Sequence, residues 1–415
     1  MEKAFFTNDA IVFGILMLVL AIVFKTASLP QFRKFYSIVP TVLLCYFIPS
    51  LLNSAGIISG QDSQLYSVAS RYLLPACLVL LTISTDFQAI HRLGGKALII
   101  FLTGSLGVVL GGPIALLIML AIAPDMVRVE GIDQIWPGLT TIAGSWIGGS
   151  ANQAAMKEVF QVDDKLFSIM VTVDIVVANF WMAFLLYGAG ISGKIDRFLK
   201  ADSRVIAEIQ QKMADYQASI VRIPQLGDVM MIGGVAFGCT ALSHWGADLI
   251  LPYLDAHKDF LEAYRLGAVN SGFFWIVVIA TTLGLGLSFT NLRQLEGVGA
   301  SQTGSLFIYI LVATIGMQMD ITAIFQYPGF LLIGIIWMTV HITLLLLVAW
   351  LIKAPFFFVA VGSQANIGGA ASAPIVASAF HPSLAPVGVL LAVLGYALGT
   401  YGGILCGYIM QAILG

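Results

Sequence analysis

The chain has 415 residues, of which 59% are hydrophobic and only 10% are charged, and its mean hydropathy is +0.94. Soluble domains carry about 25% charged residues, so this composition excludes a soluble globular protein and predicts a polytopic membrane protein. The formal net charge of −2 comes without a clustered basic patch, so we expect no nucleic-acid partner.

Ten apolar segments approach the roughly 20 residues that an α-helix needs to cross a membrane. Five lie in each half of the chain, at about 10–25, 36–58, 67–84, 96–123 and 166–189, and at about 226–245, 269–290, 303–319, 329–352 and 384–412. No small-residue cleavage site lies before Lys25, so we do not expect a removed signal peptide. The four cysteines lie in apolar segments without metal-binding spacing, so we expect them to be buried: Cys45, Cys77, Cys239 and Cys406.

Two short motifs occur once in each half of the chain. Asp86-Phe-Gln-Ala-Ile90, after the third segment, returns as Asp320-Ile-Thr-Ala-Ile324 after the eighth. Ile147-Gly-Gly-Ser-Ala-Asn152 returns as Ile367-Gly-Gly-Ala-Ala-Ser372, between the fourth and fifth segments of its half. The common order predicts an internal repeat, with residues 1–189 and 226–415 as its units. The two Asp residues are typical helix N-caps.

The paired glycines predict a break in the backbone within the segments 134–160 and 355–380, with the tips at Gly148, Gly149, Gly368 and Gly369. Each segment is either a re-entrant hairpin or a broken helix that crosses the membrane. Hairpins leave five crossings in each half, so the second half is then inverted. Thirteen of the 20 Lys and Arg residues then lie on one face, and the bias within the first half disappears if the first segment crosses. The positive-inside rule therefore favours inverted repeats with hairpins and with both termini external.

The region 190–225 is the only long polar stretch, and it predicts a linker between the repeats. Apolar residues recur in it at a spacing of three and four, namely Val205, Ile206, Ile209, Met213, Tyr216 and Ile220. This spacing is typical of an amphipathic helix on the cytoplasmic membrane surface. A solvated linker helix without membrane contact is the alternative.

Uncharged polar side chains surround both Gly-Gly motifs. Amides and hydroxyls can replace water around a substrate without adding a fixed charge, and a helix that starts after a break favours an anion at its N-terminus. Close helix packing explains Ser in membrane helices but not the four amides. We therefore predict that substrate binds to Ser145, Ser150, Asn152, Gln153, Ser363, Gln364, Asn366 and Ser372.

Asp174 is the only acidic residue in the interior of a predicted span. An ionisable group at this depth is costly and marks a functional site by default, with a structural carboxylate as the alternative. We predict a cation-coupling site at Asp174 with Thr172 and Asn179, with sodium bound near Asn152 and Asp174 as one form of it. The lone His341 is typical of a packing residue. The series Gly395, Gly399, Gly403 and Gly407 predicts a helix-packing ridge.

The duplicated motifs resemble those of a YjcL-like family of bacterial integral membrane proteins of unknown function. The architecture is similar to that of the sodium/glutamate and sodium/citrate symporters, although Gly149-Ser150-Ala151-Asn152 stands where the former have Gly-Gly-His-Gly-Thr. This resemblance implies an elevator-type transporter with a dimeric scaffold. It places substrate and Na⁺ around Ser150, Asn152, Asn366 and Ser372.

The chain lacks HExxH, GxSxG and GxxxxGK[ST] motifs, which argues against an enzyme or a nucleotide-driven pump. We expect a sodium- or proton-coupled symporter of a small organic anion, such as an amino acid, a short peptide or a carboxylate. It would form a homodimer in the bacterial inner membrane, in contact with lipid, and need no cofactor beyond its coupling ion. No Lys or Arg is predicted at the hairpin tips. A sodium/proton antiporter using Asp174 and a non-transporting receptor or scaffold are the alternatives.

Overall fold

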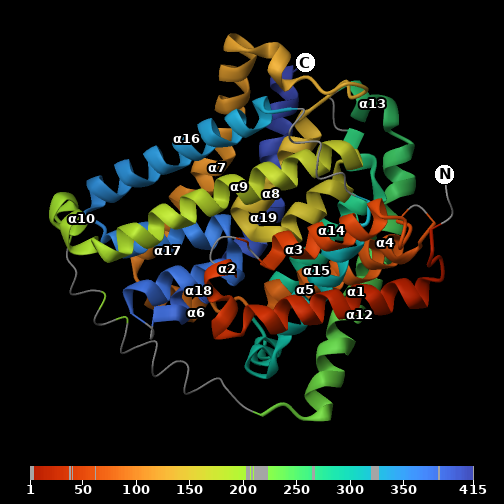
Figure 1. Ribbon diagram of the computed structural model, residues 1–415, viewed down its shortest axis with the longest axis horizontal. Coiled ribbons are helices and arrows are strands. Elements are labelled where there is room, and N and C mark those ends of the chain that lie inside the picture. Colours follow the sequence, from red (N-terminus) through yellow and green to blue (C-terminus); the bar gives the residue numbers. More distant parts are fainter. Residues whose placement is uncertain are drawn as a thin grey trace.

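The computed structural model describes residues 4–36, 39, 41–60, 62–201, 206, 209, 223–263, 267–318, 327–381 and 384–414. Within them all ten predicted apolar segments are helical, and the pairing outside helices is limited to two isolated bridges (Figure 1). Seven helical segments of these ranges are long and apolar enough to cross a membrane: Asp9–Ala27, Leu65–Ile83, Gly95–Ile122, Asp164–Gly190, Leu226–Asp255, Gly329–Ile352 and Ala385–Leu414. The chain is a polytopic helical membrane protein.

The helices form two groups that pack mainly within themselves. The scaffold bundle contains α1 (Asp9–Ala27), α3 (Thr41–Ser54), α5 (Leu74–Ile83), α12 (Leu226–Asp255), α14 (Gly272–Leu287) and α15 (Ala300–Gly316). The hairpin bundle contains α7 (Gly95–Ile122), α8 (Trp136–Val159), α9 (Asp164–Gly190), α16 (Gly329–Ile352), α17 (Phe356–Ile367), α18 (Gly369–Phe380) and α19 (Ala385–Leu414). Each half of the chain contributes to both bundles.

Short helices connect these elements: η1 (Pro30–Phe32), α2 (Arg33–Tyr36), α4 (Leu65–Val68), the π-helix η2 (Ala69–Leu73), α6 (Phe87–Arg92), η3 (Pro124–Val127), α10 (Ser192–Leu199), α13 (Lys258–Ala263), η4 (Gly267–Asn270) and η5 (Asn291–Val298). Asp86 directly precedes α6 and pairs with Arg293 at 3.4 Å. Its repeat partner Asp320 lies outside the described residues. So does most of the predicted amphipathic helix, of which only Ile206 and Ile209 are described.

Two pairs of helices, α7 with α16 and α5 with α15, run antiparallel. At one end of the pair α7 and α16, Lys96 Nζ donates to the carbonyl of Lys353 at 2.9 Å. At the other end, Gly329 lies against the backbone of Met126. In the pair α5 and α15, Ser84 at the end of α5 donates to Glu296 just before α15, at 2.6 Å. The contact of α14 with α5 also has an equivalent in the contact of α3 with α15.

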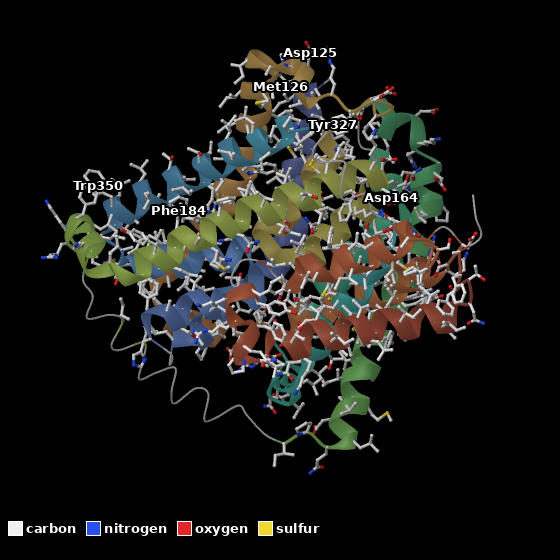
Figure 2. The ribbon with its side chains drawn as sticks, viewed as in Figure 1. Asp125, Met126, Asp164, Phe184, Tyr327 and Trp350 are labelled. Atoms are coloured by element: carbon white, nitrogen blue, oxygen red, sulfur yellow. The ribbon has the colours of Figure 1, made fainter. Side chains whose placement is uncertain are left out.

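Large apolar side chains cover the outer surface. Phe184 on α9 and Trp350 on α16 are 65% and 54% exposed, and both project away from the bundle (Figure 2). On α12, Phe237, Trp245 and Leu249 are also exposed. Such a surface is unfavourable in water but matches the hydrocarbon core of a bilayer.

The predicted glycine ridge on α19 is confirmed as a packing surface, and it faces α8. A methyl group on Gly399 would lie 2.7 Å from the Cα of Gly148, and one on Gly403 would lie 3.3 Å from the Cα of Gly144. The missing side chains therefore let the two backbones approach closely. As a result, α8 and α19 form one of the most extensive helix contacts in the chain.

The ridge allows a test of stability. We expect Gly399→Ala to lower stability by about 1–3 kcal/mol, because the added methyl group has no space against α8. Gly238→Ala on α12 is the matched control, since nothing lies within 4 Å of its added methyl group and Ala favours a helix. Thermal unfolding in detergent measures both variants. Equal unfolding midpoints for the two would contradict the tight contact.

Candidate functional site

The first Gly-Gly segment is a helical hairpin. The backbone leaves the helical conformation at Gly148 (φ −140°) and Gly149 (φ 74°). The rings of Trp136 and Phe160, at the two ends of the segment, lie 5.2 Å apart, whereas a straight helix of 24 residues would separate its ends by about 36 Å. The two arms therefore run antiparallel, and the paired glycines form the tip.

The second Gly-Gly segment has the same form. Its arms, α17 and α18, join at Gly368 and at Gly369, whose φ is 57°. The rings of Phe357 and Phe380 lie 5.2 Å apart at the open end, and Gln364 Nε2 donates to Ser372 Oγ across the arms at 2.7 Å. At that open end Asp196 of α10 accepts the backbone N–H of Phe356 at 2.7 Å.

The two tips meet. A methyl group on Gly149 would lie 3.8 Å from the Cα of Gly369 and 3.6 Å from the ring of Tyr396. Both glycines have positive φ, which costs another residue about 1–2 kcal/mol. The duplicated motif thus brings two points far apart in the sequence into contact, next to Tyr396 of α19. Tyr396 could not be selected from the sequence, because an aromatic residue in an apolar span is ordinary.

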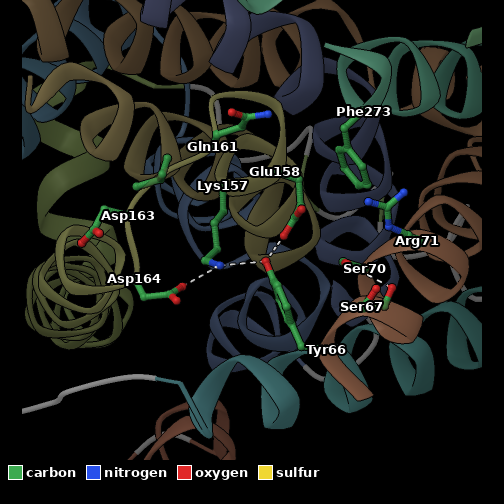
Figure 3. A pocket seen from close by; sticks show the side chains of 11 residues that line it. Tyr66, Ser67, Ser70, Arg71, Lys157, Glu158, Gln161, Asp163, Asp164 and Phe273 are labelled. Carbon is green, nitrogen blue, oxygen red and sulfur yellow. Dashed lines mark hydrogen bonds and ion pairs between the residues drawn. The ribbon is translucent and has the colours of Figure 1, made fainter. Parts of the chain in front are cut away.

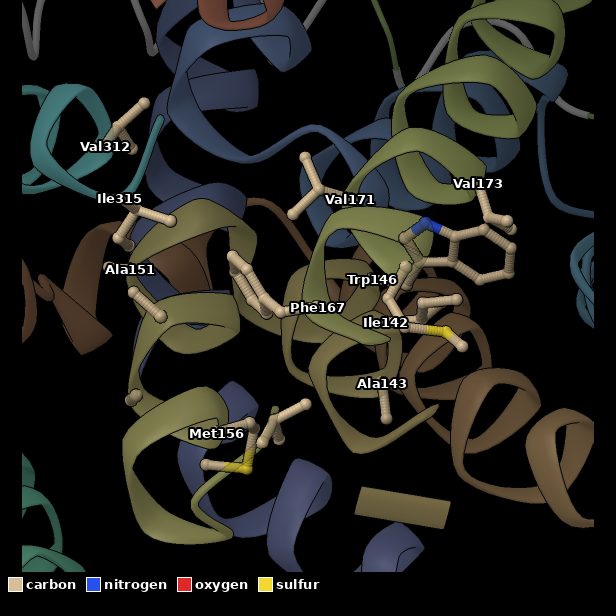
Figure 4. Close-up of a cluster of buried hydrophobic side chains, with 14 of the residues drawn as sticks. Ile142, Ala143, Trp146, Ala151, Met156, Phe167, Val171, Val173, Val312 and Ile315 are labelled. Carbon is tan, nitrogen blue, oxygen red and sulfur yellow. The ribbon is translucent and has the colours of Figure 1, made fainter. Parts of the chain in front are cut away.

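Asp174 lies on α9 against the first hairpin. Its carboxylate accepts hydrogen bonds from Ser145 Oγ at 2.6 Å, Trp146 Nε1 at 2.6 Å and Gln153 Nε2 at 2.8 Å. The carboxylate is almost fully buried, and three donors from both arms replace the water that it loses. Figure 4 shows the apolar surroundings of Trp146. Two predicted substrate residues, Ser145 and Gln153, are therefore partners of the predicted coupling carboxylate.

The other two residues predicted to share this site have different partners. Thr172 Oγ1 donates to the carbonyl of Ser168 at 2.9 Å, and Asn179 Nδ2 donates to that of Ile175 at 2.6 Å. Both bonds lie within α9, where each side chain reaches the carbonyl four residues earlier. Sharing one helix with Asp174 was thus insufficient to bring either side chain to it.

The amides Asn152 and Asn366 hold the hairpins to neighbouring helices. Asn152 Nδ2 donates to the carbonyls of Gly148 and Tyr396, each at 3.0 Å, and its Oδ1 accepts from Thr400 at 2.7 Å. Asn152 therefore faces α19, whereas the adjacent Gln153 faces Asp174. Asn152 and Asp174 were predicted to flank sodium. In the structure their side chains have different hydrogen-bond partners.

Asn366 makes the corresponding bonds on the second hairpin. Its Nδ2 donates to the carbonyls of Phe101 and Gly362, each at 3.0 Å, and its Oδ1 accepts from Ser105 at 2.6 Å. The side-chain amides of Asn152 and Asn366 are thus both fully hydrogen-bonded to other groups of the protein. In this conformation Asn152 and Asn366 position the hairpins.

Ser363 and His341 form a closed network. Ser363 Oγ accepts from Trp181 Nε1 and lies 2.8 Å from His341 Nε2. His341 Nδ1 lies 3.0 Å from the carbonyl of Gly104, so Nδ1 donates there and Nε2 accepts the Ser363 hydroxyl. His341 thus acts as the packing residue that its isolation predicts.

Three predicted residues near the tips keep free capacity for a ligand. Gln364 Oε1 is buried and accepts no hydrogen bond in the described part of the chain. An orphaned acceptor costs about 1–3 kcal/mol, which a bound donor or cation would recover. Ser150 and Ser372, from opposite hairpins, are half-buried. Within the described ranges, no group of three His, Cys, Asp or Glu side chains forms a metal cluster.

A charged pocket at the open end of the first hairpin was missed by the sequence reasoning. The cavity measures about 450 Å³ and lies between the hairpin and the segment α4–η2 (Figure 3). Lys157 Nζ donates to the Tyr66 hydroxyl at 2.7 Å and pairs with Asp164 at 2.8 Å, while that hydroxyl donates to Glu158. Cations thus occur at the base of the hairpin. The pair Lys157-Glu158 within an apolar segment was the signal.

The helical fold, the apolar surface and the polar residues within the bundle define a multi-pass integral membrane protein. Residues 14–413 match the model of a family described as protein of unknown function (DUF819), and the chain belongs to this family. It is 27% identical over 160 residues to an uncharacterized membrane protein, YjcL, of Bacillus subtilis (strain 168). That alignment covers 39% of this chain and 37% of YjcL, so the chain matches less than two thirds of that relative's length. The predicted resemblance to a YjcL-like family is confirmed.

The carboxylate on α9 allows a second test. We expect Asp174→Ala to lower the free energy of unfolding by about 3 kcal/mol, because it leaves buried donors unpaired. The emission of Trp146 should also change when its indole loses a charged acceptor. Asp125→Ala, at a carboxylate that is 86% exposed, serves as the control and should leave stability within about 0.5 kcal/mol. Equal unfolding midpoints for the native protein and both variants would rule out a stabilising role for the hydrogen bonds of Asp174.

Proposed function

We propose that the protein is a cation-coupled secondary transporter of small organic anions, with the substrate bound at the meeting point of the two hairpin tips. The observation that carries this proposal is the contact between Gly149 and Gly369. Paired interruptions at corresponding positions of two repeats are typical of transporter binding sites. Non-helical backbone at membrane depth is tolerated where protein or a water-filled cavity covers it.

Inverted repeats account for the antiparallel pairing of α7 with α16 and of α5 with α15. The hairpin ends support the same topology. Near the start of α16, Lys165 beside the first hairpin lies 5.2 Å from the ring of Tyr327. The second hairpin begins at the other end of α16, directly after Lys353. The hairpins thus open at opposite ends of one 24-residue helix, which is long enough to span the bilayer.

The tips suit an anion. The second arm of each hairpin begins at the tip, so its N-terminal N–H groups and its helix dipole favour negative charge there. Ser150 and Ser372 add hydroxyls, and Gln364 Oε1 adds an acceptor for a donor group of the substrate or for the coupling cation. Asp174 would bind the coupling cation, or would carry the coupling proton, since its carboxylate is bonded to the first hairpin.

The two bundles suit an elevator mechanism, in which the hairpin bundle moves against the scaffold bundle. The helices α14 and α19 meet between them through hydroxyl pairs: Thr281 with Thr400 at 3.2 Å, and Thr282 with Tyr401 at 2.6 Å. The exposed apolar face of α12 would suit a scaffold that dimerises. We place this transporter in the bacterial inner membrane, with external termini.

Uptake by reconstituted vesicles tests the proposal. Under an imposed Na⁺ or pH gradient, we expect accumulation of at least one member of a panel of amino acids, short peptides and carboxylates. Asp174→Asn should abolish gradient-driven accumulation, whereas Asp125→Asn should retain it. Asp174-dependent proton efflux driven by Na⁺, without uptake, would instead identify an antiporter. If the vesicles show neither uptake nor proton efflux, the protein would instead be a receptor or scaffold.

The moving contact can be tested by cross-linking. We expect Thr281→Cys combined with Thr400→Cys, in a chain whose native cysteines are replaced, to lose transport when a disulfide or mercury bridge forms. Reduction should restore transport in the same sample, and each single substitution should remain insensitive. Full activity of the bridged protein would contradict movement between α14 and α19.

A further inference from the structure

The pocket at the open end of the first hairpin is lined by basic and acidic side chains. Arg71 comes from the scaffold side, and the other charged residues come from the hairpin side. Within it, Lys157 and Asp164 pair with each other at 2.8 Å. Asp163 is the N-cap of α9, where it accepts the N–H groups of Lys165 and Leu166. Like Asp163, two further charged side chains of the pocket make no ion pair to any described residue, and neither caps a helix: Arg71 and Glu158.

Arg71 and Glu158 come from different bundles. Arg71 belongs to η2, which leads into α5 of the scaffold bundle, and Glu158 ends the second arm of the first hairpin. In Figure 3, Arg71 lies beside Phe273 and Ser70, and Glu158 lies across the pocket beside Lys157. Each points to the space between the walls. Besides the Lys157–Asp164 pair and the N-cap Asp163, the pocket therefore has one basic side chain, Arg71, and one acidic side chain, Glu158, on opposite sides.

We propose that this pocket binds a zwitterion with a carboxylate and an ammonium group on one small framework, such as an amino acid or a short peptide. The carboxylate would bind the guanidinium of Arg71, which can donate two parallel hydrogen bonds. The hydroxyl of buried Ser70 adjoins that position. The ammonium group would bind Glu158, whose carboxylate accepts one bond from Tyr66 and has further acceptor capacity.

The size and the charge balance favour this class of ligand. A volume of about 450 Å³ lies within the range of roughly 300–1,000 Å³ that small-molecule sites occupy. A ligand with only a carboxylate would leave the charge of Glu158 without a partner. A ligand with only an amine would leave the charge of Arg71 without a partner. A zwitterion satisfies both the exposed Arg71 and the half-buried Glu158, and it adds no net charge to the pocket.

This inference rests on the proposed transport function, of which it narrows the substrate class. The pocket is distinct from the tips, because Glu158 lies at the open end of the hairpin and Gly149 at its tip. A zwitterion bound here would bridge the two bundles before it reaches the tips.

Binding to purified protein, without any gradient, tests the inference. The standard L-amino acids and glycine-based di- and tripeptides are screened by thermal shift, and hits are titrated by calorimetry. Each hit is compared with its N-acetyl and amide derivatives, which lack one charge. We expect the zwitterion to bind and either derivative to bind at least about tenfold more weakly.

Charge variants locate the site. Arg71→Gln and Glu158→Gln should each weaken binding of the zwitterion at least about tenfold, and each should reduce discrimination against the derivative that lacks its partner charge. Arg128→Gln, at a surface residue paired with Asp125, should bind as the native protein does. Loss of discrimination distinguishes a ligand contact from a general structural defect.

Three outcomes would overturn the inference: no zwitterion of the panel binds, the derivatives bind equally well, or both variants retain affinity and discrimination. The proposed function fails separately. Zwitterion binding that depends on Arg71 and Glu158, without uptake under any gradient, would support this site and contradict transport. Uptake of carboxylates that is unchanged in both variants would support transport and contradict this site.

Discussion

A helix that ends inside a membrane must satisfy its terminal N–H and C=O groups without water, and the hairpin bundle depends on this constraint. At the first tip, the side chain of Asn152 bonds the carbonyls of Gly148 and Tyr396 and is itself bonded by Thr400. Asn366 ties the second hairpin to α7, since its side chain donates to the carbonyls of Gly362 within α17 and Phe101 within α7. The close approach of α19 places its carbonyl within reach of Asn152, so the glycine ridge and the amide depend on each other.

The sequence predicted much of this framework because its signals are local. The ten apolar segments follow from hydropathy, and the breaks at Gly148 and Gly368 follow from paired glycines with no other reason to sit in an apolar region. Asp174 could be selected because a carboxylate at depth is rare. The positive φ of Gly149 and Gly369 agrees with these predicted breaks.

Side-chain partners could not be predicted in the same way, because they depend on which face of a helix points where. Thr172 and Asn179 share α9 with Asp174 but bond to their own backbone, whereas Trp146 reaches the carboxylate from another helix. The pocket between Arg71 and Glu158 unites residues far apart in the chain. The pair Lys157-Glu158 could mark one wall in the sequence, but the packing of the scaffold against the hairpin is needed to bring Arg71 to it.

In the proposed elevator movement, the hydroxyl pairs between α14 and α19 would also affect how easily the two bundles slide past each other. Interdigitated apolar side chains must separate before they can shift, which opens voids and loses dispersion contacts. A threonine hydroxyl rotates and exchanges one acceptor for the next, so its bonds can be replaced one at a time. The contacts of Thr281, Thr282, Thr400 and Tyr401 would therefore suit a low barrier for sliding. In the proposed mechanism, the glycine ridge that joins α19 to the first hairpin would make those two elements move together.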